Sequence, residues 1–216
     1  MSGRVSGRVR ARRASGALAI LAAVVIGQVV TSRVPIVGAD NPPFVERGEI
    51  GDSVHLSYAD VEVTDVRPAH YLAPPVQDDL VRMAGGVWVL VSVTATAVEE
   101  PVRLDTAWLV DDEGRNYRTS TRSECAITST LPTGLPTYLL YCFDVPADRL
   151  EGLRFRLARG DLGTGRVDGD NLADVDLSVS GGDAKSWART TVAYAAKTSS
   201  LEPFELDEVT ITETDP

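Results

Sequence analysis

The sequence predicts an all-β protein, an immunoglobulin-like antiparallel β-sandwich of about eight strands over residues 53–180. Hydrophobic residues recur at every second position in most segments of this region. Gly, Pro, Asp and Asn separate these segments, and no ten-residue stretch of helical periodicity lies between them. The missing helical segments disfavour an α/β enzyme fold. With 216 residues, the chain suits one globular domain with extensions at its ends.

The first strands of the sandwich are expected just after residue 52. Val54, Leu56 and Tyr58 alternate with polar neighbours, and the alternation resumes at Val61 one position out of phase. A one-residue slip moves side chains to the opposite face of a sheet. The change of phase therefore predicts a bulge or a break near Ala59.

The strongest strand pattern runs from Gly86 to Ala97. Its alternate valines share one face, while the opposite face changes from Trp88 and Leu90 to serine and threonine. The pattern predicts a central strand whose far end faces water.

The next segments complete the predicted sandwich. Residues 102–110 and 115–120 are expected to form a hairpin, because Asp111–Gly114 between them supplies turn chemistry. Alternation predicts further strands at residues 137–144, 153–157 and 175–179.

Two segments flank the sandwich. Residues 40–52 are polar and rich in Pro and Gly, which favours a stalk. Residues 181–216 are a C-terminal extension, in which residues 183–196 fit two interpretations. One is a short helix capped by Asp183 with Trp187, Thr191 and Tyr194 on one side, and the other is a strand. Residues 198–216 hold six acids and no base, and predict a loosely ordered tail.

The N-terminal segment, residues 1–39, predicts export. Five Arg lie within the first 13 residues and precede an uncharged apolar run at residues 17–32. A basic head followed by an apolar run is typical of a secretory signal or a single-pass membrane anchor. As a helix the run would span about 24 Å, which fits either role. We expect a transmembrane or signal helix here, with the C-terminal body outside the cell membrane, or secreted if the chain is cleaved after Ala39.

The net charge of the chain limits the kinds of partner that we expect. The net charge is −10, and after residue 39 the chain holds 15 Lys and Arg against 31 Asp and Glu. Such a body repels phosphate backbones, so we expect no nucleic-acid partner. The expected contacts are the membrane, through the N-terminal segment, and an envelope protein or a cell-wall ligand.

The order of motifs resembles a known family. A first strand led by Gly51 and a Val-rich strand ending at Val93–Thr96 precede Trp108–Tyr117, and a Pro-Thr-Gly turn at residues 132–134 leads into Tyr141–Pro146. Over residues 50–180 this order resembles the telokin-like, immunoglobulin-like extracellular domains of actinobacteria. That family has no assigned function and includes a secreted mycobacterial antigen. The resemblance implies an exported β-sandwich, tethered or secreted, without known catalytic residues. The two cysteines and the acidic tail depart from the family pattern.

The two cysteines are candidates for a disulfide. Cys142 lies in a predicted strand, and Cys125 lies 17 positions earlier in the preceding connection. In an oxidising compartment the pair would fix this connection to the sheet. Two buried free thiols are the alternative.

A calcium site is a weak alternative role for the acidic segment near residue 170. The carboxylate and amide oxygens that calcium prefers come from Asp168, Asp170, Asn171, Asp174 and Asp176. Their spacing is not that of a calcium-binding loop, and it lacks the bidentate Glu, which favours an acidic turn. His55 and His70 are too few for a convincing metal site.

No catalytic constellation is evident in the sequence. The sequence contains no Gly-x-Ser-x-Gly motif, and it has no Gly-rich loop of the kind that binds phosphate. The predicted function is therefore a non-catalytic envelope module that needs no cofactor. A calcium-dependent binding module is one alternative. The other is an envelope hydrolase, which would need a deep cleft with His55 or His70 beside a carboxylate.

Overall fold

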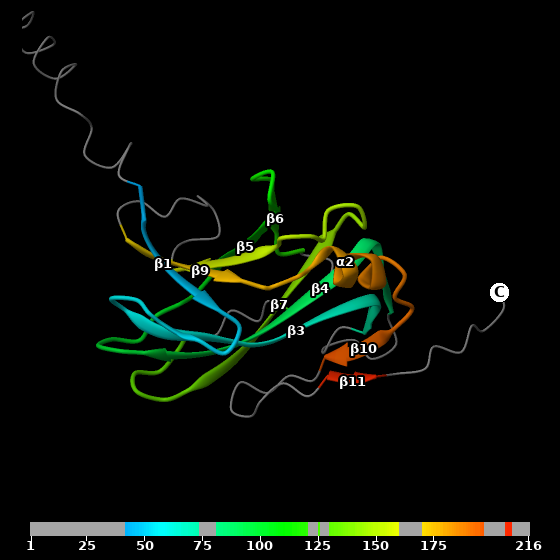
Figure 1. The fold of residues 1–216 in the computed structure, drawn as a ribbon. Coiled ribbons are helices and arrows are strands. Elements are labelled where there is room, and N and C mark those ends of the chain that lie inside the picture. The colour runs from blue at the N-terminus through cyan, green and yellow to red at the C-terminus, as the bar shows by residue number, and fades with distance from the viewer. Residues whose placement is uncertain are drawn as a thin grey trace, which may run out of the picture. The chain divides into compact units, whose positions relative to one another are not determined.

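The computed structural model describes residues 42–73, 81–120, 125, 130–159, 170–196 and 206–208. These residues form two β-sheets packed face to face, which confirms the predicted all-β sandwich (Figure 1). The five-stranded sheet has the order β1 (Phe44–Glu49), β9 (Asn171–Asp176), β8 (Arg154–Ala158), β5 (Thr106–Val110) and β6 (Asn116–Arg118). The six-stranded sheet has the path β11 (Leu206–Glu208), β10 (Ala193–Ala196), β3 (Ala59–Ala73), β4 (Arg82–Ala97) and β7 (Thr137–Val145), and β2 (Ser53–His55) pairs with β3.

The connections are those of an immunoglobulin-like fold. The chain changes sheet between β4 and β5, between β6 and β7, and between β7 and β8. The neighbours β9-β8-β5-β6 correspond to strands G, F, C and C′ of a variable-type domain, and β3-β4-β7 correspond to A, B and E. The predicted hairpin is present as β5 and β6, which pair antiparallel.

The main core lies between the sheets. Val87, Val89, Val91 and Val93 all point into it, as their alternation predicts. Aromatic rings from both sheets meet there, with the ring centroids of Tyr141 and Phe155 5.5 Å apart. The predicted break near Ala59 is also present, because β2 ends at His55 and β3 begins at Ala59.

A second apolar cluster covers one end of the outer face of the six-stranded sheet. It contains Trp88 and Leu90 of β4 with Leu140 and Cys142 of β7, and Cys125 packs against them. Further along β4, Thr94 and Thr96 are only partly buried. The prediction that the far end of this strand faces water is therefore confirmed.

The flanking segments differ from their predictions. The predicted stalk at residues 40–52 contains a strand of the sandwich, because β1 lies within it and pairs parallel with β9. Its side chains are exposed or partly exposed, so β1 depends on backbone hydrogen bonds and carries no hydrophobic alternation. This is why the sequence pattern missed the strand.

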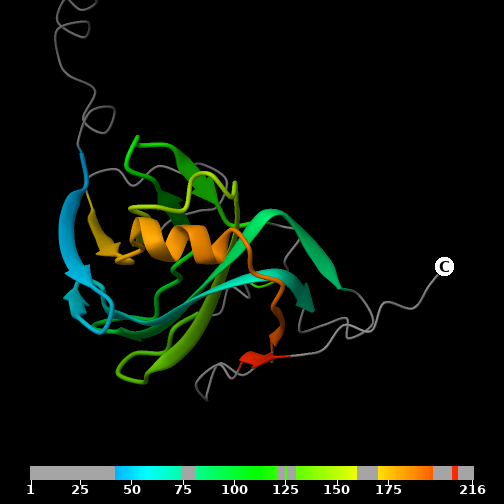
Figure 2. The same ribbon diagram turned by 45° about the vertical axis from the view of Figure 1, so that its right-hand side comes forward.

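The region 183–196 contains both a helix and a strand. α2 (Gly181–Trp187) has Ser180 as its N-cap, and Asp183 completes a capping box three residues later. The helix ends at Trp187, so the expected helical stripe through Thr191 and Tyr194 is wrong. α2 lies along one side of the sandwich and packs Trp187 against the core (Figure 2).

The C-terminal extension continues past α2 as a part of the sheet. β10 pairs parallel with the end of β3, and β11 pairs antiparallel with β10. The predicted loose tail therefore includes a strand at Leu206–Glu208. The rest of the tail, and residues 1–39 with the predicted export segment, lie outside the described residues.

Candidate binding surface

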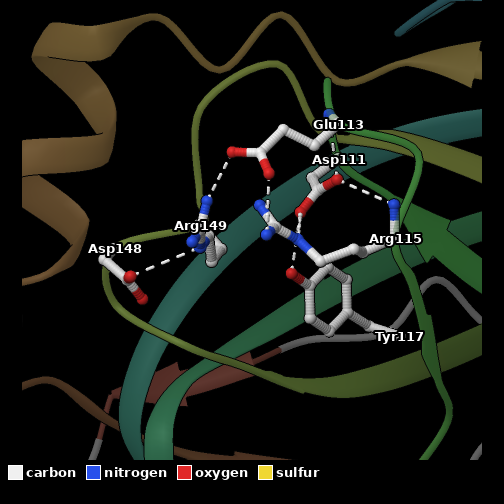
Figure 3. A network of polar contacts seen from close by, with 6 residues as sticks. All are labelled: Asp111, Glu113, Arg115, Tyr117, Asp148 and Arg149. Atoms are coloured by element: carbon white, nitrogen blue, oxygen red, sulfur yellow. Dashed lines mark hydrogen bonds and ion pairs between the residues drawn. The ribbon is translucent and has the colours of Figure 1, made fainter.

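The turn between β5 and β6 is built around a buried carboxylate. Asp111 is only 4% exposed, and its Oδ1 accepts hydrogen bonds from the backbone N–H groups of Glu113 and Arg115 at 3.1 and 2.9 Å. Its Oδ2 accepts from Arg115 Nε and from the Tyr117 hydroxyl, both at 2.8 Å (Figure 3). Four donors on one carboxylate fix the hairpin, and Gly114 adopts the positive φ of +79° that the turn requires.

These contacts keep Asp111 charged. Burial alone raises the pKa of this carboxyl, but the hydrogen bonds from Arg115 and Tyr117 outweigh that effect and lower the pKa to about 2. A carboxyl with such a pKa is a poor general acid or base near neutral pH. The network therefore acts as a structural element of the turn.

The network extends to the connection between β7 and β8. Arg115 Nη1 lies 2.8 Å from one oxygen of Glu113, and Arg149 Nη1 lies 2.6 Å from the other (Figure 3). Arg149 also pairs with Asp148 at 3.3 Å. Glu113 thus bridges two arginines and joins two loops at the same end of the sandwich.

Several arginine side chains and a tryptophan lie on the outer face of the five-stranded sheet. Because Leu109, Phe155 and Val175 point into the core, their alternating neighbours point away from it. The strand register then places one residue of each strand in a row across the sheet: Arg47, Asp174, Arg156, Trp108 and Arg118. We call this row, with Arg154 beside it, the arginine face.

Two of its arginines hold a buried carboxylate. Asp174 is 3% exposed, and its Oδ1 accepts a hydrogen bond of 2.8 Å from Arg154 Nε. Its Oδ2 lies 3.2 Å from Arg156 Nη2, and Arg154 Nη1 also lies 3.2 Å from Asp176. These pairs are structural, because breaking a buried pair leaves an uncompensated charge.

The two remaining arginines stand at the two ends of the row. Arg47 and Arg118 lie on the two outermost strands, both are exposed, and neither makes an ion pair with another residue of the described ranges. Trp108 is half-buried and stands next to Arg118 across the β5–β6 pair. Unpaired guanidinium groups beside an accessible aromatic ring can bind anionic and planar or apolar groups of a ligand.

In the structure, the candidate calcium ligands contact different partners and do not form one site. Asp170 pairs with Arg159 and accepts from the backbone of Asn171, whose own side-chain oxygen lies 3.4 Å from the Ser57 backbone N–H. Asp174 and Asp176 bind the arginines already described, and Asp168 lies outside the described residues. Within the ranges that the structure describes, no three His, Cys, Asp or Glu side chains form a group that could hold a metal ion.

The cysteine prediction is confirmed. Cys125 and Cys142 form a disulfide with their Cα atoms 5.7 Å apart. Both residues are buried in the second apolar cluster, so the bond fixes residue 125 over the outer face of the six-stranded sheet.

The histidines lie at the surface of the sandwich. His55 Nδ1 is 2.7 Å from Asp60 Oδ1, but these side chains are 78% and 45% exposed, so they do not line a deep cleft. The ring of His70 packs edge-on against Tyr71. Among the described residues, no helix has the length and hydropathy to cross a membrane.

Sequence patterns could not locate the arginine face, since it depends on which strands are neighbours. The only signal was the alternation of Arg154 and Arg156 with apolar residues, and of Asp174 and Asp176 with apolar residues. Both patterns show that charged side chains share one face of a strand. Neither pattern indicates that the two strands are adjacent.

Comparison with known proteins gives distant structural neighbours. No protein-family model matches the sequence, and no curated protein sequence matches it. The yjhA protein of Bacillus subtilis is 17% identical over 60% of this chain and 99% of its own, with a TM-score of 0.43. The secreted protein MPT63 of Mycobacterium tuberculosis is 16% identical over 62% of this chain and 99% of its own, with a TM-score of 0.43. An uncharacterized β-sandwich protein of Clostridium difficile is 12% identical over 62% of this chain and 97% of its own, with a TM-score of 0.38.

Proposed function

We propose that this chain is a non-catalytic binding module of the cell envelope, and that its arginine face binds an envelope protein or a wall ligand. The observation that carries this proposal is the row formed by the half-buried Trp108 with Arg47 and Arg118, two exposed arginines that make no ion pair with any residue that the structure describes. Charged side chains without partners gain the most from an added ligand, because they need not break an ion pair first.

An extracytoplasmic location is supported by two features. The disulfide between Cys125 and Cys142 persists in oxidising compartments and is rare in the cytosol. The basic head and apolar run of residues 1–39 match an export segment or an anchor. We propose that this segment either holds the sandwich at the membrane or is removed after Ala39, and that the sandwich lies outside in both cases.

Membership of the telokin-like extracellular family is also a proposal. It is supported by the order of motifs between residues 50 and 180 and by the immunoglobulin-like order of the strands. The family would account for a binding role, since sandwich folds of this kind carry many functions on their surfaces.

The two alternatives have less support. Calcium would have to compete with arginines for the carboxylates of Asp170, Asp174 and Asp176. A hydrolase would need a nucleophile and a sheltered base, whereas the pair of His55 and Asp60 is exposed. Unfolding of the full chain with millimolar calcium against a chelator tests the first alternative, because a specific site would raise the melting temperature by several degrees.

Photo-crosslinking in intact cells tests the proposed surface. A photoreactive phenylalanine analogue replaces Arg118 in one variant and Arg189 in another, since Arg189 is an exposed arginine outside both sheets. Irradiation should attach an envelope component to the variant at position 118 and leave the variant at position 189 mainly uncrosslinked. Equal crosslinking at the two positions, or none at position 118 in a correctly exported protein, would overturn the proposal.

A further inference from the structure

We infer that the ligand of the arginine face is a linear anionic glycan of the envelope, bound across the strands. The inference rests on the proposed function and names the chemical class of the ligand. It follows from the spacing of the arginines, the place of Trp108 between two of them and the small apolar area of the face.

The row has a linear geometry. Neighbouring strands lie about 4.8 Å apart, so the five residues from Arg47 to Arg118 extend over roughly 19 Å. Arg156 stands midway between them, two strands from each. The two end arginines therefore lie roughly 19 Å apart along a line perpendicular to the strands, with Arg156, which also pairs with Asp174, midway between them. This arrangement fits a chain molecule whose charges repeat better than it fits a single small anion.

Trp108 supports a ligand that contains sugar rings. It stands in the row between Arg156 and Arg118, with its side chain half-buried between their strands. An aromatic ring offers an apolar face on which the C–H face of a sugar ring packs, while a neighbouring guanidinium group binds a carboxylate or phosphate on the same polymer. The two kinds of contact together select a charged sugar over a charged peptide.

A protein partner fits this face less well. A stable protein interface buries about 800 Å² on each side around an apolar centre. On the same side as the row, Val110 is only 7% exposed, and Val45, two residues before Arg47 on β1, is 41% exposed. These side chains add a limited apolar surface beside the row. A polymer needs only a narrow line of contacts, which the row provides.

Charge is compatible with this ligand despite the acidic composition of the body. The outer face carries Arg47, Arg118, Arg154 and Arg156 against three carboxylates, Glu49, Asp174 and Asp176. At physiological ionic strength the Debye length is about 8 Å, so acidic groups elsewhere on the domain are largely screened. Binding is therefore measured at about 0.15 M salt.

The test is a binding series with the full chain purified in mild detergent. The probes are polygalacturonate and phosphorylated dextran as charged sugars, neutral dextran as an uncharged sugar, and poly-glutamate as a charged chain without sugar rings. Arg47→Gln and Arg118→Gln remove the two exposed cations at the ends of the row, and Arg189→Gln is the matched control because it removes an exposed arginine elsewhere. Trp108→Phe shortens the aromatic face. Arg156 is left intact, because it holds Asp174.

The inference expects one of the charged sugars to bind, with neutral dextran and poly-glutamate much weaker. Arg47→Gln and Arg118→Gln should each weaken binding about threefold, and about tenfold together, while Arg189→Gln leaves it within twofold. Trp108→Phe should weaken binding of the sugar polymer in a protein whose melting temperature is close to wild type. If that variant is unstable, the arginine variants decide alone.

Two results in which a polymer does bind overturn the inference. One is equal binding of poly-glutamate and the charged sugars, and the other is a charged sugar whose affinity the arginine variants leave unchanged. Absence of any polymer binding also overturns the glycan, but it leaves the proposed function in place if crosslinking at position 118 still captures an envelope protein. If both polymer binding and crosslinking are absent, the inference and the proposed function fail together.

Discussion

At the scale of single residues, the charge on Asp111 is buried and yet favourable. Its carboxylate accepts hydrogen bonds from two backbone N–H groups and from the side chains of Arg115 and Tyr117. These hydrogen bonds stabilise the charged form and outweigh the cost of burying it. Glu113 differs, because it is 58% exposed and its two ion pairs compete with water. The two acids of the same turn should therefore contribute very differently to stability.

Replacing Asp111 tests this difference. Asp111→Asn should lower the free energy of unfolding by about 2 kcal/mol at pH 7, because the amide group opposes the donors that face it. The pKa of Asp111 is lowered to about 2 in the folded protein, so its contribution is complete above about pH 4 and is lost as the pH falls toward 2. Urea unfolding of both proteins between pH 7 and pH 2 should show their stabilities converge in this acidic range.

Glu113→Gln serves as the control for this measurement. Its effect should stay below about 0.5 kcal/mol at all these pH values, as expected for an exposed ion pair. A loss at Glu113 as large as at Asp111, or a difference for Asp111→Asn that persists unchanged at pH 2, would refute the assignment.

A second residue whose size is critical is Gly86, where β4 approaches β7. A Cβ at Gly86 would lie 2.1 Å from the carbonyl oxygen of Val145 and 2.8 Å from the Cα of Pro146. The backbone N–H groups of Gly85 and Gly86 also donate to the two oxygens of Asp144, at 2.9 and 3.0 Å. The close approach and the carboxylate together fix the beginning of β4 against the end of β7.

Gly86→Ala should therefore destabilise the protein by about 3 kcal/mol, because the backbone of β7 must move to admit the methyl group. Thermal unfolding measures the loss. Gly182→Ala is the comparison, since its Cβ would meet only Ser180 Oγ at 3.6 Å and α2 favours Ala over Gly. A Gly86→Ala protein as stable as the Gly182→Ala protein would show that the two strands are not so close.

At the scale of elements, the six-stranded sheet is covered on its inner face and on one end of its outer face. Its inner face packs in the main core, and one end of its outer face is covered by residue 125 and, in part, by Tyr194 and Leu206. Arg67 of β3 also lies over the Tyr194 ring, 5.8 Å from its centroid, so the C-terminal extension contributes contacts to the fold. These contacts explain why Trp88 is fully buried although it points away from the main core.

Removing the disulfide tests this outer cluster. The double variant Cys125→Ala and Cys142→Ala should lose roughly 3 kcal/mol, the value that the chain-entropy model gives for a loop of this length. It should also bind more of a hydrophobic dye, because Leu90 and Leu140 lose their cover. Chemical unfolding and dye fluorescence measure the two effects, with dithiothreitol-treated wild type as a second reduced form. Wild-type stability in both reduced forms would contradict the expected role.

The sequence predicted those elements whose side chains alternate between the core and water. β4, β7 and the hairpin of β5 and β6 belong to this group, because every second residue enters the core. β1 has no such pattern, since none of its side chains is buried and it pairs with a strand more than a hundred residues away. Residues 183–196 were ambiguous because the capping box at Ser180 favours a helix, whereas the backbone of β3 makes Ala193–Ala196 a strand.

The candidate surface was beyond sequence analysis for a related reason. The pairing of Asp174 with Arg156 and of Trp108 with Arg118 follows from the register of four strands. The acidic segment around residue 170 suggested calcium, because the arginines that hold its carboxylates lie on another strand or 11 residues earlier in the chain. Register is a property of the sheet, and no local pattern encodes it.

At the scale of the whole molecule, the two outer faces differ in character. The outer face of the five-stranded sheet carries four arginines, and two of these have no ion-pair partner in the part of the chain that the structure describes. On the six-stranded sheet, the exposed end near β2 carries Asp60 and Glu62, and the other end is apolar and covered. An anionic ligand would therefore meet favourable charge on one face of the domain, which orients the module relative to its ligand.

Arginine footprinting measures the central claim most directly. The full chain is treated with phenylglyoxal, with and without isolated cell envelope, and mass spectrometry gives the modified fraction of each exposed arginine. If the arginine face is the binding surface, the envelope should reduce modification of Arg47 and Arg118 several-fold and leave Arg189 unchanged. Equal modification of Arg47 and Arg118 with and without envelope, in a protein that the envelope retains, would contradict the account.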